Sequence, residues 1–207
     1  MKNLLKSPKT LLLTGLVGTA VLMGCAVQTL QLPVPGAYYP KAAAIGHQQA
    51  IVLNTNDARS RGVLDQNSYM SDYPIEVGSD MRGRLETAMS AMIKARGFMP
   101  TTTATGKDPN AYMTVTVNDI HLWPAPQTLQ RQTRAQVVLS IVAHNMGNSY
   151  EQTYTGTATH DSIIPATKEM NISLTQSAFD QAFNQVYSDQ KLWDFFNKGS
   201  KKMWMLS

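Results

Sequence analysis

The sequence contains a single cysteine, Cys25, among its 207 residues. With no second thiol available, the chain cannot form an internal disulfide. The four histidines are scattered and share no helical ligand spacing: His47, His121, His144 and His160. A zinc site of the usual cysteine and histidine kinds is therefore not predicted. His121 and His160 could meet across neighbouring strands, but we interpret each histidine as a surface or hydrogen-bonded residue.

Sequence motifs of two common catalytic classes are also missing. The chain contains no Gly-x-Ser-x-Gly elbow and no glycine-rich loop that would cradle a phosphate. We therefore expect a protein that is not an enzyme and that has no cofactor. The alternative is a small-ligand-binding protein or an enzyme, with a pocket between a helix and the sheet.

The folded part of the chain also lacks an excess of positive charge. The full sequence has 18 Lys and Arg against 14 Asp and Glu, a formal charge of +4. Lys2, Lys6 and Lys9 would be removed with a signal peptide, which leaves 15 cations against 14 anions. A nucleic-acid-binding domain would carry a basic patch of its own, so no nucleic-acid partner is predicted.

The N-terminus is typical of a secretory signal peptide. A positive start is followed by the apolar segment Leu11–Met23, which ends in Leu22-Met23-Gly24-Cys25. This segment is shorter than the about 20 apolar residues of a membrane span. Its ending resembles the bacterial lipobox, in which the cysteine receives diacylglycerol and becomes the N-acylated first residue after cleavage. We therefore predict a lipid anchor on Cys25.

Two alternatives to this anchor are an ordinary cleaved signal with a chance cysteine nearby and an uncleaved N-terminal anchor. The absence of any partner cysteine favours lipidation. Ala26 follows the cysteine, whereas an aspartate there would retain the protein at the inner membrane in enterobacterial-type sorting. We therefore expect the cell outer membrane, with the protein facing the periplasm.

The sequence divides into four predicted segments. They are a lipoprotein signal peptide at 1–24, a lipidated tether at 25–46, a single α+β domain at 47–197 and a C-terminal tail at 198–207. The tether is rich in proline and has little apolar periodicity, which is typical of a linker. The tail contains a basic cluster of Lys198, Lys201 and Lys202 beside Trp204. This cluster could touch anionic lipid, but we expect a frayed, solvated tail.

The first half of the domain predicts a strand followed by a helix. A continuous apolar run at Gln49–Asn54 is typical of a buried strand, and a short edge strand could follow at Tyr73–Val77. Apolar residues then recur at steps of four and three from Met81 to Ala95, which predicts an amphipathic helix. Ser79 is a suitable N-cap and Gly97 a suitable left-handed C-cap for this helix.

The second half predicts three strands and a helix. Alternating residues predict strands at Ala111–Leu122, Arg134–Ala143 and Ser149–His160. A phase switch at Asn118-Asp119 indicates a β-bulge, and Asn145-Met146-Gly147-Asn148 is typical of a hairpin turn. Trp123 is expected to close the strand end over the core.

A second helix is predicted at about Asn171 to Tyr187, where apolar residues recur at steps of four. Ser188-Asp189 can cap a short last helix. The resulting order of strand, helix, three strands and helix predicts an α+β fold. We expect an antiparallel sheet of about four strands, two main helices packed on one of its faces and a short C-terminal helix.

Several segments together resemble the YajG-type bacterial lipoproteins. They are the lipobox, the loop Asp57-Ala58-Arg59, the helix from Asp80-Met81-Arg82 to Ala95-Arg96-Gly97-Phe98, and the ending from Asp189 to Phe196. The similarity spans about residues 48–197. It implies the location and fold of an outer-membrane lipoprotein, and it supplies no active site.

Two groups of charged residues are candidate contact sites. Asp57, Arg59 and Arg61 form a polar loop after the first strand. They are interpreted either as an ion pair that orders the strand exit or as a partner-binding loop. Arg82 and Arg84 lie near a helix start, where the helix dipole disfavours cations. Such misplaced charges indicate a possible contact surface.

The expected function is therefore non-enzymatic. We predict a structural, accessory or regulatory subunit that binds other envelope proteins, in a secretion or flagellar complex or in the regulation of cell-wall synthesis. Its partners would be the membrane, through the lipid anchor, other envelope proteins, and peptidoglycan or its synthases. If the strand Ser149–His160 lies at the sheet edge, its free backbone groups could also accept a partner strand.

Overall fold

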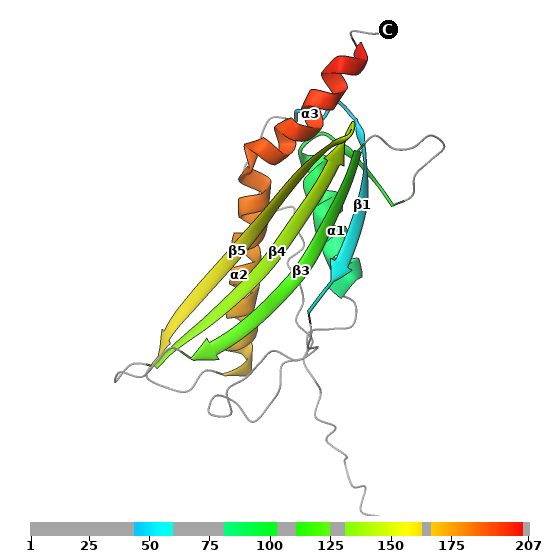
Figure 1. The fold of residues 1–207 in the computed structure, drawn as a ribbon. Coiled ribbons are helices and arrows are strands. Elements are labelled where there is room, and N and C mark those ends of the chain that lie inside the picture. Colours follow the sequence, from blue (N-terminus) through cyan, green and yellow to red (C-terminus); the bar gives the residue numbers. More distant parts are fainter. Residues whose placement is uncertain (1–43, 60–80, 103–110, 125–130, 163–166, 205–207) are drawn as a thin grey trace, which may run out of the picture.

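The computed structural model describes residues 44–59, 81–102, 111–124, 131–162 and 167–204. Its elements are β1 (Ala50–Asp57), α1 (Met81–Ala95), β2 (Met99–Thr101), β3 (Ala111–Pro124), β4 (Arg131–Asn145), β5 (Asn148–Ser162), α2 (Lys168–Ser188) and α3 (Gln190–Trp204). The strands form one twisted sheet, and α1 and α2 lie behind it (Figure 1). The predicted α+β class is confirmed.

The sheet has five strands in the order β2-β1-β3-β4-β5. The strands β3, β4 and β5 form the predicted antiparallel meander. β1 pairs in parallel with both β2 and β3, because α1 carries the chain back to the end of the sheet where β1 began. The sheet is therefore mixed, where an antiparallel sheet was predicted, and β2 is a strand that the sequence pattern did not predict.

The predicted bulge and hairpin turn are both confirmed. Val117 pairs with Leu139 and Asp119 with Val138, so Asn118 is the extra residue that shifts the register. Met146 and Gly147 have φ angles of 49° and 80°, as a two-residue turn of the hairpin type requires. The bulge keeps the apolar side chains of β3 on one face along its whole length.

The core lies between the sheet and the helices. The strand side chains that face the helices alternate with polar ones, and almost all of them are buried. The buried side chains that α1 and α2 contribute to the core include Met81, Leu85, Met89, Met92, Phe179 and Phe183. At the middle of β5, Gly156 lets α2 approach so closely that a Cβ atom would clash with the carbonyl oxygen of Ala178.

Residues 44–49 enter the domain at the C-terminal end of α1. Gly97 has a φ of 82°, and the amide of Phe98 donates to the carbonyl of Ile93, which confirms the predicted left-handed cap. The amides of Ile45 and Gly46 both donate to the carbonyl of Arg96 at 3.0 Å. The chain therefore joins the domain beside this cap.

A polar cluster joins α2 and α3 to the sheet. Asp189, between the two helices, accepts hydrogen bonds at Oδ2 from the hydroxyls of Tyr150 and Tyr154, each at 2.6 Å. Burial of the Asp189 carboxyl raises its pKa, but the hydrogen bonds from the two tyrosines outweigh this and hold the pKa below its usual value. Burial, together with the bond to Asp189, raises the pKa of Tyr154.

Two sequence predictions on helices differ from the structure or lie outside it. α3 continues to Trp204, so residues 198–204 are helical where a frayed tail was expected. Its first turns are anchored by Leu192, Trp193 and Phe196, all fully buried. The possible strand at Tyr73–Val77 and the N-cap at Ser79 lie outside the described residues.

Candidate interaction surfaces

The predicted loop after β1 contains a tight ion pair. Nε and Nη2 of Arg59 donate to the two carboxylate oxygens of Asp57 at 2.7 and 2.5 Å. This two-pronged contact holds the pKa of the Asp57 carboxyl below its usual value. Its geometry fits the interpretation that the pair orders the exit from β1. Arg61, the third residue of this candidate loop, lies outside the described residues.

Arg82 lies beside the same end of β1. Its Nε donates to the carbonyl of Thr55 at 3.2 Å, and the Thr55 hydroxyl donates back to the Arg82 carbonyl at 3.3 Å. The start of α1 is thereby fixed to β1, two residues before Asp57. The structure thus brings Arg82 to the end of the sheet that carries Asp57 and Arg59, and Arg84 follows half-buried on α1.

The face of the sheet opposite the helices is not covered by any described element. All three helices contact strands from the other side or from one end of the sheet (Figure 1). Polar and β-branched side chains predominate on this face. Its central residues are Thr114, Thr116, Gln136, Val138, Ser140, Val142, Thr153, Thr155 and Thr157. We call this surface the open face.

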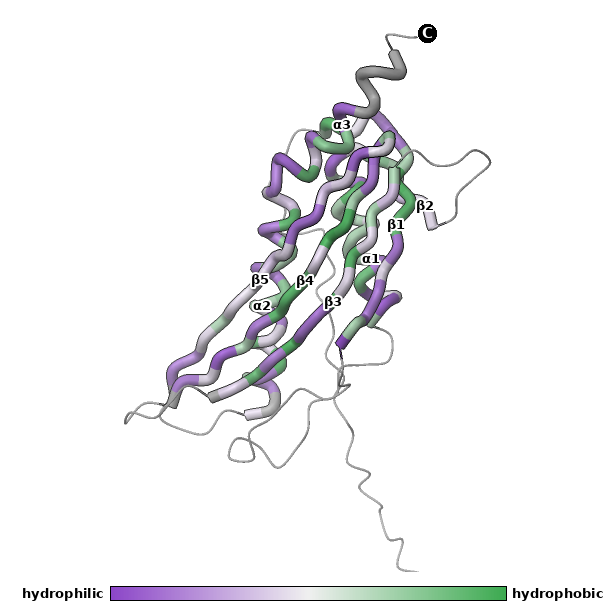
Figure 2. The backbone as a smooth tube through the Cα atoms, viewed as in Figure 1, coloured by the Kyte–Doolittle hydropathy of each residue, from purple (hydrophilic) through white to green (hydrophobic). Residues whose placement is uncertain are grey.

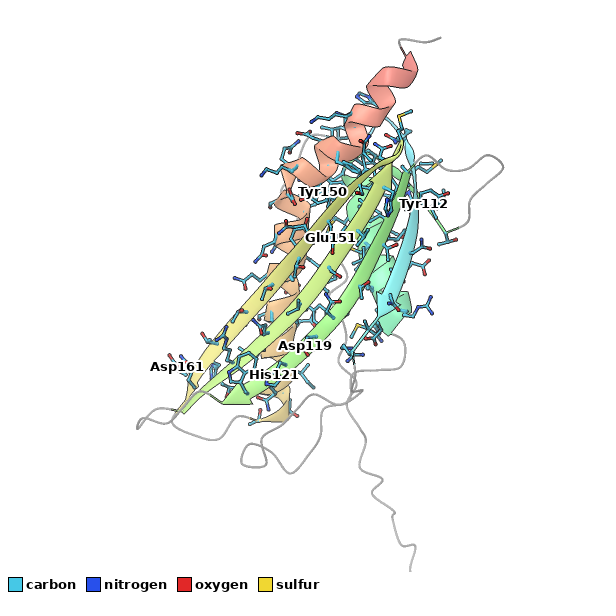
Figure 3. The ribbon with its side chains drawn as sticks, in the orientation of Figure 1. Tyr112, Asp119, His121, Tyr150, Glu151 and Asp161 are labelled. Atoms are coloured by element: carbon cyan, nitrogen blue, oxygen red, sulfur yellow. The ribbon has the colours of Figure 1, made fainter. Side chains whose placement is uncertain are left out.

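The charges on the open face are sparse. Figure 3 shows Tyr112, Asp119 and His121 along β3 and Glu151 on β5. Hydrophilic residues prevail along β5, whereas hydrophobic and hydrophilic residues mix along β3 and β4 (Figure 2). A face of threonine, glutamine and a few charges is the composition expected of the solvated side of a sheet.

An aromatic cluster at the far end of the open face was not predicted. The Trp123 ring lies 4.4 Å from the His121 ring, and the Arg134 guanidinium lies 4.9 Å from the Trp123 ring centre. The expectation that Trp123 closes the core was wrong, because the bulge at Asn118 puts odd-numbered residues after it on the open face. The predicted bulge was the signal that could have placed Trp123 there.

The structure does not bring His121 and His160 together, although the sequence allowed a contact between them across strands. His121 pairs with Gln136 on β4, whereas His160 on β5 pairs with Thr133. The strand β4 lies between them. Their side chains also point to opposite faces of the sheet. Thr157 of β5 lies across from His121 and shares its face, and His160 is three positions further along β5, so its side chain points to the other face. Within the described residues, no group of three His, Cys, Asp or Glu side chains could hold a metal ion.

The free edge of β5 is partly closed by α2. The amide of Thr157 donates to Oε1 of Gln181, and Nε2 of Gln185 donates to the carbonyl of Thr155 at 2.9 Å. These side chains occupy backbone groups that a partner strand would need. The middle of the edge is therefore blocked for strand addition, which was one of the expected modes of binding.

The space between helices and sheet is the place where the alternative function requires a pocket. In the described residues this interface is filled by apolar side chains, and Met81, Leu85, Met92, Phe179 and Phe183 are each at most 2% exposed. Asp189, an ionisable group at the edge of this interface, is used in a structural contact. None of the described helices is long and apolar enough to cross a membrane.

Comparison with protein families gives a match over most of the chain. Residues 35–197 match a family described as uncharacterized lipoprotein. The chain belongs to this lipoprotein family. As a bacterial lipoprotein it is membrane-anchored, in agreement with the N-terminal pattern that ends at Cys25. No curated protein matches the sequence.

Several solved structures match the chain at low sequence identity. A Xanthomonas campestris protein is 13% identical and covers 84% of this chain and 97% of its own, with a TM-score of 0.46. The minor lipoprotein of Acinetobacter baumannii is 10% identical, with coverages of 73% and 92% and a TM-score of 0.39. Lipoprotein GNA1162 of Neisseria meningitidis is 11% identical, with coverages of 64% and 96% and a TM-score of 0.32.

Proposed function

We propose that this protein is a YajG-type lipoprotein of the outer membrane that faces the periplasm and binds other envelope proteins without catalysing a reaction. The lipid on Cys25 holds it at the membrane, and the open face of the sheet is its docking surface. Candidate settings are an envelope-spanning secretion or flagellar complex, or the regulation of cell-wall synthesis, with peptidoglycan or its synthases as possible partners.

The single observation that carries this proposal is the one-sided sheet. Three long strands present a broad polar surface, while the helices fill the other side with a closed apolar core. A protein that uses a buried pocket would instead converge ionisable groups on a cavity between these layers. The filled interface therefore favours a surface-binding role over the small-ligand or enzymatic alternative.

Site-specific photo-crosslinking in intact cells tests the docking surface. A crosslinking amino acid at Thr116 or Thr153 samples the open face, and one at Ser173 or Asn184 samples the exposed side of α2. We expect the same envelope protein to be captured from both open-face positions and from neither helix position. Equal capture from both sides, or none from the open face, would contradict the proposal.

The anchor has a separate test. Growth with a palmitate analogue should label the wild-type chain and leave Cys25→Ser unlabelled. Membrane fractionation of the labelled protein should then place it with the outer membrane. Equal label in both chains would exclude acylation of Cys25, whatever the crosslinking experiment reveals about the open face.

A further inference from the structure

One end of the domain combines the entry of the tether with α3. Residues 44–49 are hydrogen-bonded to the end of α1, as described above. Phe98, directly after α1, packs against Trp193 and Phe196 of α3 with ring centres 5.9 and 6.0 Å apart. Nδ2 of Asn145, in the β4–β5 turn, donates to the carbonyls of Phe195 and Phe196. We call this end the tether pole.

The tether pole also contains the exposed large hydrophobic side chains of the described residues. Met99 is 47% exposed and Met146 is 40% exposed. The amide of Met99 donates to the carbonyl of Gln49, beside the entering chain, and Met146 is at the tip of the turn that contacts α3. The described sheet therefore has its exposed apolar tips at the end where the anchored segment enters.

The same pole has an excess of positive charge. Lys94, in the last turn of α1, and Lys191 and Lys198 of α3 are exposed. α3 continues beyond the strands through Lys201 and Lys202 (Figure 1). The backbone of α3 is therefore helical up to Trp204, where a frayed tail was expected.

Two of the described acidic residues near this pole are engaged in the fold, and the exposed Glu151 lies on the open face, three residues after the β4–β5 turn (Figure 3). Asp189 is bonded to two tyrosines, and Asp194 is half-buried and accepts a hydrogen bond from Gln190 at 2.9 Å. Among the described side chains of the tether pole, the exposed lysines therefore outnumber the exposed acidic residues. Exposed methionines beside clustered lysines are the combination that binds an anionic lipid surface, through insertion of apolar tips and attraction to headgroups.

We propose that the tether pole is a second membrane contact, in which α3 and the two exposed methionines lie on the anionic lipid surface that holds the acyl chains of Cys25. This contact goes beyond the docking role, and it fixes the orientation of the domain. The open face, whose strands run away from the pole, remains free for a protein partner.

Fluorescence quenching in reconstituted vesicles tests this contact. The lipidated full chain is placed in phosphatidylethanolamine vesicles with about a third of brominated phosphatidylglycerol, since an anionic surface of this kind should attract lysines. The contribution of Trp204 is the difference between wild type and Trp204→Phe. We expect strong quenching of Trp204 by the brominated anionic lipid and little quenching by a brominated neutral lipid.

Charge variants provide the decisive comparison. Three lysines near an anionic surface strengthen binding by on the order of a hundredfold, so Lys198→Gln/Lys201→Gln/Lys202→Gln should abolish most of the quenching. About 0.5 M salt should do the same. The matched control is Arg131→Gln/Arg134→Gln/Lys168→Gln, which removes three cations from the other end of the domain and should leave quenching unchanged.

The opposite pattern would overturn the proposal. Quenching that is equal in neutral and anionic vesicles, or that survives in the lysine variant, would exclude an electrostatic contact by α3. A second pair, Met99→Gln/Met146→Asn, tests the apolar tips independently and should weaken quenching severalfold. No effect of either set of substitutions would mean that only the acyl chains touch the membrane.

Discussion

The guanidinium of Arg96 lies 4.3 Å from the centre of the Tyr187 ring, and its Nη2 donates to the carbonyl of the same residue. Arg96 follows α1 and Tyr187 lies in the last turn of α2, so this contact joins the two helices. Trp193 of α3 lies on the same guanidinium at 5.5 Å and donates its indole N–H to the carbonyls of Val186 and Tyr187. One buried cation therefore unites three helices.

The first prediction concerns this contact. We expect Tyr187→Leu to destabilise the domain more than Arg96→Met, because it leaves a buried charge without the nearer of its two aromatic partners, whereas Arg96→Met removes the charge itself. A double-mutant cycle measured by urea unfolding should give a coupling free energy of about 1 to 2 kcal/mol. Lys94→Met combined with Tyr187→Leu should be additive, and a coupling of zero for the Arg96 pair would contradict the role assigned to it.

The second prediction is a pH dependence at Asp189. Its folded pKa is below the unfolded value of about 3.9, so its contribution to stability is present above that pH and is lost as the pH falls through the folded pKa. Asp189→Asn removes the charge and keeps a capping side chain for α3. It should lower the free energy of unfolding by about 1 to 2 kcal/mol at pH 7.

Urea unfolding at several pH values checks this prediction. The difference in free energy of unfolding between wild type and Asp189→Asn should become smaller as the pH falls below about 4. The double substitution Tyr150→Phe/Tyr154→Phe should lower the free energy of unfolding by much of the same amount. Its effect should not add to that of Asp189→Asn when the two are combined. A difference that stays constant down to the acid transition would show that the charge of Asp189 is not what the tyrosines stabilise.

The third prediction tests the close approach of α2 to β5. Gly156→Ala should cost about 2 to 3 kcal/mol of stability, because the added methyl group meets the backbone of α2. Ala178→Gly should not rescue it, since the obstructing atom is the Ala178 carbonyl oxygen. In contrast, Gly147→Ala meets no atom within 4 Å and should cost only about 1 kcal/mol, from its positive φ.

The fourth prediction concerns the edge of β5. Removal of both blocking side chains in Gln181→Ala/Gln185→Ala frees the amide of Thr157 and the carbonyl of Thr155 for another strand. Sedimentation velocity should detect self-association at least about tenfold stronger than in wild type, a change of about 1.4 kcal/mol. Ser173→Ala/Asn184→Ala, on the same helix but away from this edge, should leave the sedimentation unchanged.

An unchanged sedimentation profile of the glutamine variant would mean that the long edge is protected by something other than these two side chains. Circular dichroism should accompany the measurement. It separates strand addition by a folded domain from aggregation of an unfolded one.

Local periodic patterns predicted much of the fold. The helices α1 and α2, the bulge at Asn118 and the turn at Met146-Gly147 are each specified by residues that are neighbours in the sequence. The parallel pairing of β1 was not predictable in this way, because a continuous apolar run does not state the direction of its partners. β2 has only three residues and contains Pro100, so it lacks a strand pattern.

The buried polar contacts could not be predicted for a related reason. The acceptor of Arg96, the carbonyl of Tyr187, is 91 positions away in the sequence. The same holds for Asp189, whose tyrosine partners are 35 and 39 positions away. By contrast, the pair of Asp57 and Arg59 was predictable, because only one residue separates them.

The length of the meander gives the domain the mechanics of a lever. A strand of 15 residues, as in β4 and β5, is about 50 Å long. A tilt of about 10° at the tether pole therefore displaces the far end, with Trp123 and Arg134, by about 9 Å. Because the three long strands belong to one sheet, such a rotation would also turn the whole open face as a rigid body. The tilt of the domain relative to the membrane then decides which envelope proteins the open face can contact.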